Sequence, residues 1–137
     1  MNELFRSRGC RKNVLNEFYG SSETRASSVL LPPDYEEKPV RYGSVGKIRC
    51  AETRVYNKEK NAWCLPGEDG SILNRSLTTL NLNYVGSSER ADKAMRFIAG
   101  QNWFDDGLQG HMDEDGFLYL TGRDKEKIGR ASCRERV

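Results

Sequence analysis

Histidine, paired cysteines and long apolar runs are scarce or absent in this sequence. Its 137 residues include a single histidine, His111, so there is little imidazole for a metal site or for a serine or cysteine triad. The four cysteines are scattered, and no two of them form the close pair that zinc knuckles and thioredoxin-like redox motifs need. They are Cys10, Cys50, Cys64 and Cys133. We therefore expect free thiols, and we expect any chemistry to come from other residue types.

No apolar run approaches the length of a membrane span, and residues 1–8 lack the apolar stretch of a secretory signal. These absences predict no membrane span and an intracellular, cytoplasmic location, with the organelle left open. Hydrophobic residues make up 36% and charged residues 31%, which is typical of a folded protein with a polar surface. A length of 137 residues favours one domain with a modest core.

Residues 128–137, with the sequence IGRASCRERV, break abruptly with the pattern before them, because they hold three arginines and show no helix or strand periodicity. Back-translated with suitable codons, the stretch resembles a common short-read sequencing adapter read in one frame. We hypothesise that the natural reading frame was lost near Ile128 and that a disordered, non-natural tail follows. The alternative is a genuine, solvated basic tail. Without the tail's three arginines and one glutamate, the 22 basic and 20 acidic residues become 19 of each, so no basic excess points to a nucleic-acid partner.

The first 39 residues predict little regular structure. Residues 2–8 are typical of the last turn of a helix, and residues 14–19 of a short strand that ends at Gly20. A loop of small polar residues is expected next. We expect residues 30–39 to form an irregular connector, because their prolines fix φ and remove backbone donors.

From Val40 onward, short β-type segments alternate with turn signals, which predicts a small barrel or sandwich. The expected strands are residues 46–48, 52–56 and 71–75, with turns at 57–61 and 66–70. Residues 88–98 form the best helical pattern, with a serine at 87 or 88 as the cap and Gly100 as the stop. A hairpin comes last, with strands at 110–112 and 117–120 around a turn at 113–116.

The first motif that carries chemistry is Phe18-Tyr19-Gly20-Ser21-Ser22-Glu23-Thr24. It resembles the Tyr-Gly-x-Thr-Glu signature of the adenylate-forming superfamily, which includes acyl- and aryl-CoA synthetases, peptide-synthetase adenylation domains and beetle luciferases. In such a loop an aromatic face can cover an adenine, glycine lets the backbone approach, a hydroxyl can donate to a phosphate oxygen and a carboxylate can hold Mg²⁺. The resemblance gives these roles to Tyr19, Gly20, Ser22 and Glu23, with Ser21 among the nucleotide-binding residues.

Further segments resemble the scaffold of the same family. Gly43-Ser44-Val45-Gly46 is similar to its Gly-Ser-Val-Gly, and residues 66–72 are similar to its Pro-Gly-Glu-x-Gly-Glu-Ile stretch. Asn83-Tyr84-Val85 and the helix after Gly86 look like a diverged form of its Gly-Tyr-x element and the helix that follows.

The last motif, residues 103–127, both matches the family and departs from it. Trp103-Phe104, the hairpin and Thr121-Gly122-Arg123-Asp124-Lys125-Glu126 fit its Trp-x-x-Thr-Gly-Asp, its hairpin and its Gly-Arg-x-Lys hinge. Where the family has Thr-Gly-Asp, this chain has Asp106-Gly107-Leu108. The carboxylate that accepts both ribose hydroxyls is thus replaced by leucine, which cannot accept a hydrogen bond. By resemblance, Arg123 helps to hold the ribose or a phosphate, and Lys125 occupies the hinge between the large and small domains.

Asp106 lies two residues before Leu108, and alternate residues of a strand share a face, so a local shift could bring its carboxylate to the ribose. Alternatively, Leu108 is a sequence error, or the chain is a degenerate copy that binds nucleotide weakly. Taken singly, Tyr19 is more commonly a core aromatic and Arg123 a solvated charge. It is the ordered set of motifs that indicates nucleotide binding.

The resemblance implies an α+β fold, namely the end of the large N-terminal domain of an adenylate-forming enzyme. We expect mainly an antiparallel β-barrel-like subdomain with one or two helices, truncated at the hinge. Residues 1–39 would be the end of the nucleotide-binding α/β subdomain and its connector, and residues 40–122 the β-rich subdomain. Residues 123–127 would be the hinge, followed by the tail at 128–137.

The implied function is part of the adenylation domain of an ATP-dependent acid–thiol ligase, which couples a carboxylate to AMP and then forms a thioester. Its cofactors would be ATP or AMP, Mg²⁺ and coenzyme A, and its partners a small carboxylic acid and a nucleotide. The family's phosphate loop and catalytic lysine are not in this sequence, so no catalytic set is complete and we expect the chain alone to be inactive. Two alternatives stay open: a non-catalytic β-rich interaction domain or degenerate pseudoenzyme, and a peptide-synthetase adenylation domain.

Overall fold

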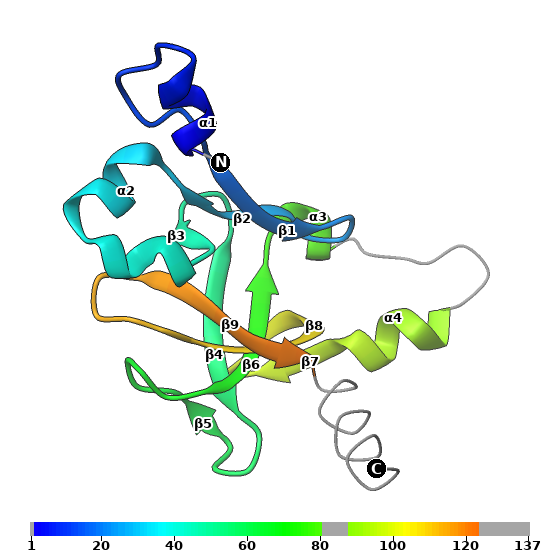
Figure 1. Cartoon of the computed structure of the whole chain (residues 1–137). Helices are drawn as coiled ribbons and strands as arrows, with labels where there is room; N and C mark the ends of the chain where they lie inside the picture. Colours follow the sequence, from blue (N-terminus) through cyan, green and yellow to red (C-terminus); the bar gives the residue numbers. More distant parts are fainter. Residues whose placement is uncertain (1, 81–87, 124–137) are drawn as a thin grey trace, which may run out of the picture.

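A nine-stranded sheet makes up most of the described chain (Figure 1). The computed structural model describes residues 2–80 and 88–123. The strands follow the order β1-β2-β3-β9-β8-β6-β4-β5, with β7 also paired to β8, and each of these pairings is antiparallel. The strands are β1 Glu17–Ser21, β2 Arg25–Leu30, β3 Gly46–Ile48, β4 Glu52–Asn57, β5 Ala62–Trp63, β6 Gly70–Arg75, β7 Met95–Ile98, β8 Gln101–Met112 and β9 Phe117–Arg123.

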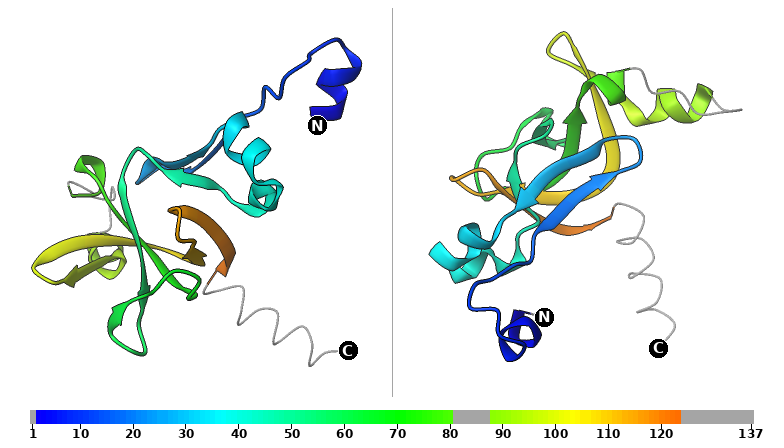
Figure 2. Two further views of the ribbon diagram at one scale, coloured as in Figure 1. Left: turned by 90° about the vertical axis from the view of Figure 1, so that its left-hand side faces the viewer. Right: turned by 90° about the horizontal axis from the view of Figure 1, so that it is seen from above.

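Short helical segments surround this sheet. Figure 2 shows α1 and α2 beyond the β1–β2 hairpin, whereas α4 lies beside the β7–β8 hairpin. The segments are α1 Asn2–Ser7, α2 Pro32–Glu37, the 3₁₀ turn η1 Pro39–Gly43, α3 Leu77–Leu80 and α4 Ser88–Ala94. The predicted α+β class with a mainly antiparallel sheet is confirmed, with the qualification that the sheet is open, because β1 and β5 end the strand order without pairing to each other. In the described residues, no helix has the length and apolar character that a membrane crossing requires.

The prediction of an irregular connector at residues 30–39 is wrong, because Pro32–Glu37 forms helix α2. The two prolines stand in the first turn of this helix, where a backbone N–H has no intrahelical acceptor and a fixed φ is already helical. The carboxylate of Asp34 accepts a hydrogen bond from the N–H of Leu31 at 2.8 Å, which stabilises the start of the helix. Tyr35 anchors it, since its ring is 3% exposed and its hydroxyl donates to the carbonyl of Leu15 at 2.9 Å.

Two other elements also differ from expectation. The small polar loop after Gly20 is mostly strand β2, in which Ser27 and Ser28 are fully buried between β1 and β3. The helix predicted for residues 88–98 ends at Ala94, and Met95–Ile98 forms strand β7. Pairing of β7 with β8 outweighs the three- and four-residue apolar spacing, because propensity yields to tertiary contacts.

The core consists of three apolar clusters that are distributed along the sheet. Their buried members are Tyr19, Val55, Ile72 and Leu118 in the first, Leu30, Tyr35 and Phe117 in the second, and Tyr56, Leu73 and Trp103 in the third. The first cluster packs β1 against β4, β6 and β9. It therefore brings the first strand of the sheet into contact with the last.

Candidate functional site

The turn between β1 and β2, residues 21–24, is closed by reciprocal hydrogen bonds. The backbone N–H of Ser21 donates to Oγ1 of Thr24 at 2.9 Å, and the N–H of Thr24 donates back to Oγ of Ser21 at 3.1 Å. Thr24 is 2% exposed, whereas Ser22 is exposed and Glu23 is half-buried. The hydroxyls of Ser21 and Thr24 thus hold the turn, and Ser22 and Glu23 are the residues that it presents at its surface.

Gly20 permits an unusually close approach of two strands. A β-bulge interrupts the β1–β2 pairing between Tyr19 and Gly20, and Arg25, which is paired with Ser21, has a positive φ of 57°. A Cβ atom on Gly20 would lie 1.6 Å from the carbonyl oxygen of Arg25. Only glycine fits at such a distance, so the close backbone approach expected here occurs between two strands of the protein itself.

A network of polar side chains lies buried where β1, β4, β6 and β8 meet. The hydroxyl of Tyr19 donates a short hydrogen bond to Oδ2 of Asp106, and the amide of Asn74 donates to the same oxygen at 3.2 Å. Oδ1 of Asp106 accepts from the N–H of Leu108 at 3.1 Å, and the hydroxyl of Thr53 donates to Oδ1 of Asn74 at 2.7 Å. We refer to Tyr19, Thr53, Asn74 and Asp106 as the Tyr19–Asp106 network. It joins the motif at residues 18–24 to the motif at residues 103–127.

Burial shifts the acidity of both central members of this network. Loss of solvent raises the pKa of Tyr19 far above its usual range, and the neighbouring Asp106 carboxylate raises it further. Loss of solvent also raises the pKa of Asp106, although the hydrogen bonds from Tyr19 and Leu108 offset part of that change. The tyrosine is therefore a neutral donor at pH 7. Its ring is 7% exposed, so its aromatic face is covered by the protein and its hydroxyl is bonded to Asp106.

Arg123 and Leu108 are directly opposed in the β8–β9 pairing. Opposed residues in an antiparallel pair leave the same face of the sheet. Leu108 is half-buried and packs against the cluster that contains Tyr19. The exposed Arg123 therefore extends from the face of the sheet on which Tyr19 contacts Asp106. Figure 1 shows the β1–β2 turn and the end of β9 on the same side of the molecule.

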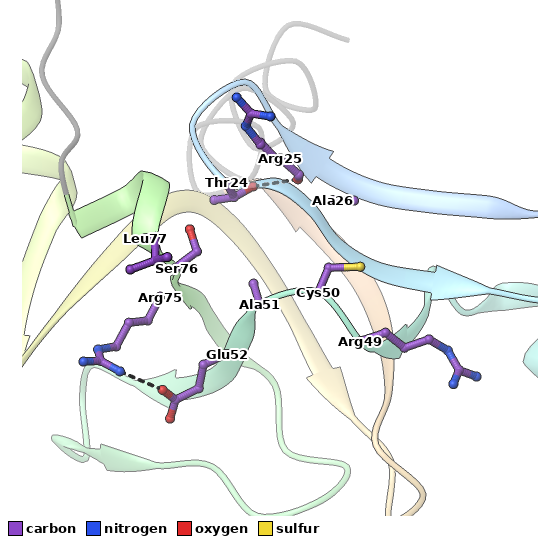
Figure 3. Close-up of a pocket in the computed structure, with 10 residues that line it drawn as sticks. All are labelled: Thr24, Arg25, Ala26, Arg49, Cys50, Ala51, Glu52, Arg75, Ser76 and Leu77. Atoms are coloured by element: carbon purple, nitrogen blue, oxygen red, sulfur yellow. Dashed lines mark hydrogen bonds and ion pairs between the residues drawn. The ribbon is translucent and has the colours of Figure 1, made fainter.

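A pocket of about 680 Å³ opens beside the β1–β2 turn (Figure 3). It lies between Thr24–Ala26, the connection from β3 to β4 and the end of β6. In Figure 3 the small side chains of Ala51 and Ser76 reach its interior, whereas the guanidinium groups of Arg49 and Arg75 point outward. Arg75 pairs with Glu52 at 3.2 Å, and Arg49 pairs with Asp34 at 3.1 Å. The pocket thus has a floor of small residues, and the two arginines at its edge are paired with carboxylates.

The magnesium role expected of Glu23 fits a single carboxylate on an accessible turn. Within the part of the chain that the structure describes, no three His, Cys, Asp or Glu residues gather as a metal cluster. Mg²⁺ commonly uses one or two carboxylates and takes its remaining ligands from phosphates and waters. Glu23 would therefore hold Mg²⁺ only together with a nucleotide.

Known proteins are similar to this chain in both fold and sequence. The chain is 37% identical over 100 residues to a probable CoA ligase (CCL9) of Humulus lupulus, an alignment that covers 73% of this chain and 17% of the relative. It is 34% identical over 110 residues to a 2-succinylbenzoate–CoA ligase of Bacillus licheniformis, with 80% of this chain and 21% of that protein covered. The o-succinylbenzoate CoA synthetase of Bacillus subtilis, solved with its acyl-adenylate intermediate, matches at a TM-score of 0.65 and 26% identity. That match covers 88% of this chain and 29% of the synthetase.

The chain belongs to the adenylate-forming superfamily. The fold and the motif order both agree with this family, although no protein-family model matches the chain. The chain spans 17% and 21% of the length of the two curated relatives described here. The hydrogen bond from Tyr19 to Asp106 joins the Tyr19–Glu23 loop to the Asp106–Arg123 region. Lys125 and the tail at 128–137 lie outside the described residues.

Two members of the Tyr19–Asp106 network were missed from the sequence. Asn74 is fully buried in β6, and Thr53 is 6% exposed in β4. Asn74 could have been noticed as an amide next to the apolar pair Ile72 and Leu73, since a buried amide requires hydrogen-bond partners. Thr53 carries no comparable signal, because threonine is a common strand residue.

Proposed function

We propose that this chain supplies part of the nucleotide-binding site of an AMP-forming acid–thiol ligase of the acyl- or aryl-CoA synthetase type. One observation carries the proposal: the hydroxyl of Tyr19 is hydrogen-bonded to the carboxylate of Asp106, on the face from which Arg123 extends. Tyr19 and Asp106 are separated by 87 positions in the sequence, yet they are in contact. They belong to the first and the last of the motifs that resemble the family. The CoA-ligase relatives and the acyl-adenylate in the Bacillus subtilis structure support this assignment.

In this proposal Asp106 replaces the carboxylate that Leu108 lacks. Its carboxylate would accept a ribose hydroxyl, Tyr19 and Asn74 would hold that carboxylate in place, and Arg123 would pair with ribose or phosphate oxygens. Ser22 would donate to a phosphate oxygen, and Glu23 would share Mg²⁺ with the nucleotide. ATP, when bound, supplies the adenylyl group that activates the carboxylic acid.

The complete reaction is assigned to a whole protein of the length seen in the relatives. Stabilising the charge that develops on phosphoryl oxygens requires preorganised cations on several sides. Among the proposed binding residues of the described chain, Arg123 is the only cation. We therefore propose that the chain alone binds nucleotide weakly and forms no acyl-adenylate, and that the acid and the thiol acceptor, coenzyme A in this proposal, are bound with the help of other segments.

One observation favours the alternative of a non-catalytic interaction domain. Tyr19 is buried and Leu108 packs on the same apolar cluster, so the nucleotide face is partly closed. If this closure is permanent, the chain retains the scaffold of the family without its ligand. The two functions differ in whether AMP binds at Asp106 and Arg123.

Isothermal titration calorimetry with AMP and Mg²⁺ tests the proposal on the chain as it exists. We expect weak binding to the wild type, and roughly tenfold weaker binding to Asp106→Asn and to Arg123→Gln, the loss expected for one charged hydrogen bond. Asp92→Asn, on the exposed face of α4, is the control and should bind like the wild type. Leu108→Asp should tighten binding. No heat of binding in the wild type and in Leu108→Asp would contradict the proposal and favour the interaction domain.

A further inference from the structure

A second pocket, of about 660 Å³, lies at the opposite end of β4 and β6 from the first. Tyr56 and Trp63 line it from β4 and β5, Leu73 from β6, and residues 96–99 from β7 and the turn after it. We call it the aromatic pocket. Its volume lies in the range of about 300 to 1,000 Å³ that is typical of small-molecule sites.

Three aromatic side chains line the aromatic pocket: Tyr56, Trp63 and Phe97. Trp63 makes edge-to-face contacts with Tyr56, at a centroid distance of 5.2 Å, and with the buried Trp103, at 5.0 Å. A hydrogen bond from the Tyr56 hydroxyl to the side chain of Asn61 fixes the tyrosine. Phe97, which lines the pocket from β7, is 75% exposed. These rings provide apolar area at little entropic cost, and a planar ligand can stack or pack edgewise on them.

Two cations at this pocket share one buried carboxylate. Nζ of Lys58 lies 3.0 Å from Oδ2 of Asp105, and Nε of Arg96 lies 3.3 Å from the same oxygen. The Asp105 side chain is 5% exposed, and its other oxygen accepts from the N–H of Gly107 at 3.0 Å. Lys58 and Arg96 are 40% and 48% exposed, so both reach the pocket from a fixed anchor. The cluster carries a net positive charge.

Arg96 uses only part of its guanidinium group in the contact with Asp105. It contacts Asp105 through Nε, and its two terminal nitrogens make no hydrogen bond to the described residues. A guanidinium held in this way presents the pair of N–H groups that matches a carboxylate or a phosphate. Asp105 is therefore a positioning residue.

We propose that the aromatic pocket binds a planar aromatic anion. The ring of the ligand lies against Trp63 and Phe97, and its carboxylate or phosphate is held by Arg96 and Lys58. This site is distinct from the proposed nucleotide site. Asp105 and Asp106 are consecutive residues of β8, so their side chains leave opposite faces of the strand. Asp105 contacts Lys58 and Arg96, whereas Asp106 contacts Tyr19 and Asn74.

The chain contains a built-in reporter for this proposal. Its two tryptophans are Trp63, which lines the pocket, and Trp103, which contacts Trp63. We would follow their fluorescence while titrating the chain with 4-nitrobenzoate, an aryl carboxylate, and separately with AMP. The neutral 4-nitrotoluene serves as the uncharged counterpart. Quenching by 4-nitrobenzoate alone identifies an aryl acid as the ligand, and quenching by AMP identifies a nucleotide.

Single-charge variants decide the proposal. Arg96→Gln and Lys58→Gln should each lower the affinity for the quenching anion roughly tenfold. The affinity of the wild type for 4-nitrotoluene should be no higher than the affinity of these variants for the anion. Lys60→Gln is the matched control, because Lys60 lies on the same turn but pairs with Glu68. Asp106→Asn should leave this quenching unchanged although it weakens AMP binding at the nucleotide site, so the two proposals fail separately. The proposal is overturned if neither anion quenches the fluorescence. It is also overturned if Arg96→Gln and Lys58→Gln are quenched as strongly as the wild type and have unchanged thermal melts.

Discussion

The two ends of the β8–β9 hairpin differ in what holds them. At the turn, residues 113–116, the stabilising contacts are mostly local: Oδ1 of Asp113 accepts from the N–H of Asp115 and of Phe117, both at 2.9 Å. At the open end, around Asp106 and Leu108, the partners come from strands far away in the sequence. The backbone of the turn is thus held by a neighbouring side chain, whereas the candidate site is held by residues of the assembled sheet.

Charge is also handled differently at the two ends. Asp115 at the turn is exposed and pairs with Lys38 at 2.7 Å and with Arg41 at 2.8 Å. The Arg41 guanidinium also lies 3.8 Å above the ring of Phe117. Asp106 at the open end depends instead on Tyr19, Asn74 and a backbone N–H. The open end should therefore be more sensitive to the loss of a neutral hydrogen bond.

The largest expected effect comes from separating the open end from β1. Gly20→Ala would place a Cβ 1.6 Å from the carbonyl oxygen of Arg25, and the β1–β2 pairing would have to move. We expect a loss of at least about 3 kcal/mol in the free energy of unfolding, measured by urea denaturation. Gly43→Ala is the control: Gly43 has no positive φ and an added Cβ meets nothing within 4 Å, so its effect should stay within about 0.5 kcal/mol.

Removing one hydroxyl tests the network itself. Tyr19→Phe leaves a buried carboxylate with one donor fewer, which should cost about 1 to 3 kcal/mol of unfolding free energy. Tyr42→Phe removes the same hydroxyl from a ring that is 59% exposed, and it should change stability by less than about 0.5 kcal/mol. Equal melting temperatures for the two variants would mean that the Tyr19–Asp106 bond contributes nothing.

At the turn, Arg41→Met should cost about 1 to 2 kcal/mol, because the buried guanidinium loses Asp115 and the face of Phe117. Asp115 keeps Lys38, which limits the loss. Lys38→Met removes only an exposed ion pair and should cost about 0 to 1 kcal/mol. Chemical denaturation of both variants in 0.1 M and 1 M salt would separate them, since only the exposed pair is strongly screened.

The smallest effect is a pH dependence of opposite sign at the two ends. Burial raises the pKa of Asp106, so its native form binds a proton more tightly and stability falls as pH rises past the ordinary aspartate value of about 3.9. Hydrogen bonds from Lys38 and Arg41 lower the pKa of Asp115, so its contribution is present above that value and is lost as pH falls.

Asp106→Asn should remove the first component, and its stability relative to the wild type should rise as the pH rises above about 4. Asp115→Asn should show the reverse trend as pH falls below about 4. Urea midpoints measured across this range decide the signs. Parallel curves for the wild type and Asp106→Asn would contradict the buried titration of Asp106.

The sequence predicted well those parts whose signals are local. The hairpin turn, strands β3, β4 and β6, and the helix near Asn2 were predicted because turn residues and alternating patterns act over a few positions. Helix α2 was not, because prolines at a helix start look the same in sequence as prolines in a loop. Strand β7 was not, because its apolar spacing also fits a helix and only β8 decides between them.

For the candidate site, motif matching identified Tyr19, Asp106 and Arg123, but not the contacts among them. That the ring of Tyr19 is covered by the protein could not be read from a motif, because its burial depends on Val55, Ile72 and Leu118. Asn74 and Thr53 belong to no motif, and they enter the site only through the register of β4, β6 and β8. The roles proposed for Ser22, Glu23 and Arg123 remain predictions.

The central claim is that AMP is bound where Asp106 and Arg123 share a face. An amide chemical-shift titration of the ¹⁵N-labelled chain with AMP and Mg²⁺ tests it most directly. We expect the largest shifts at Ser22, Glu23, Leu108 and Arg123, and we expect Asp106→Asn to raise the AMP concentration that produces them roughly tenfold. Shifts confined to other residues, or a titration that Asp106→Asn leaves intact, would contradict it.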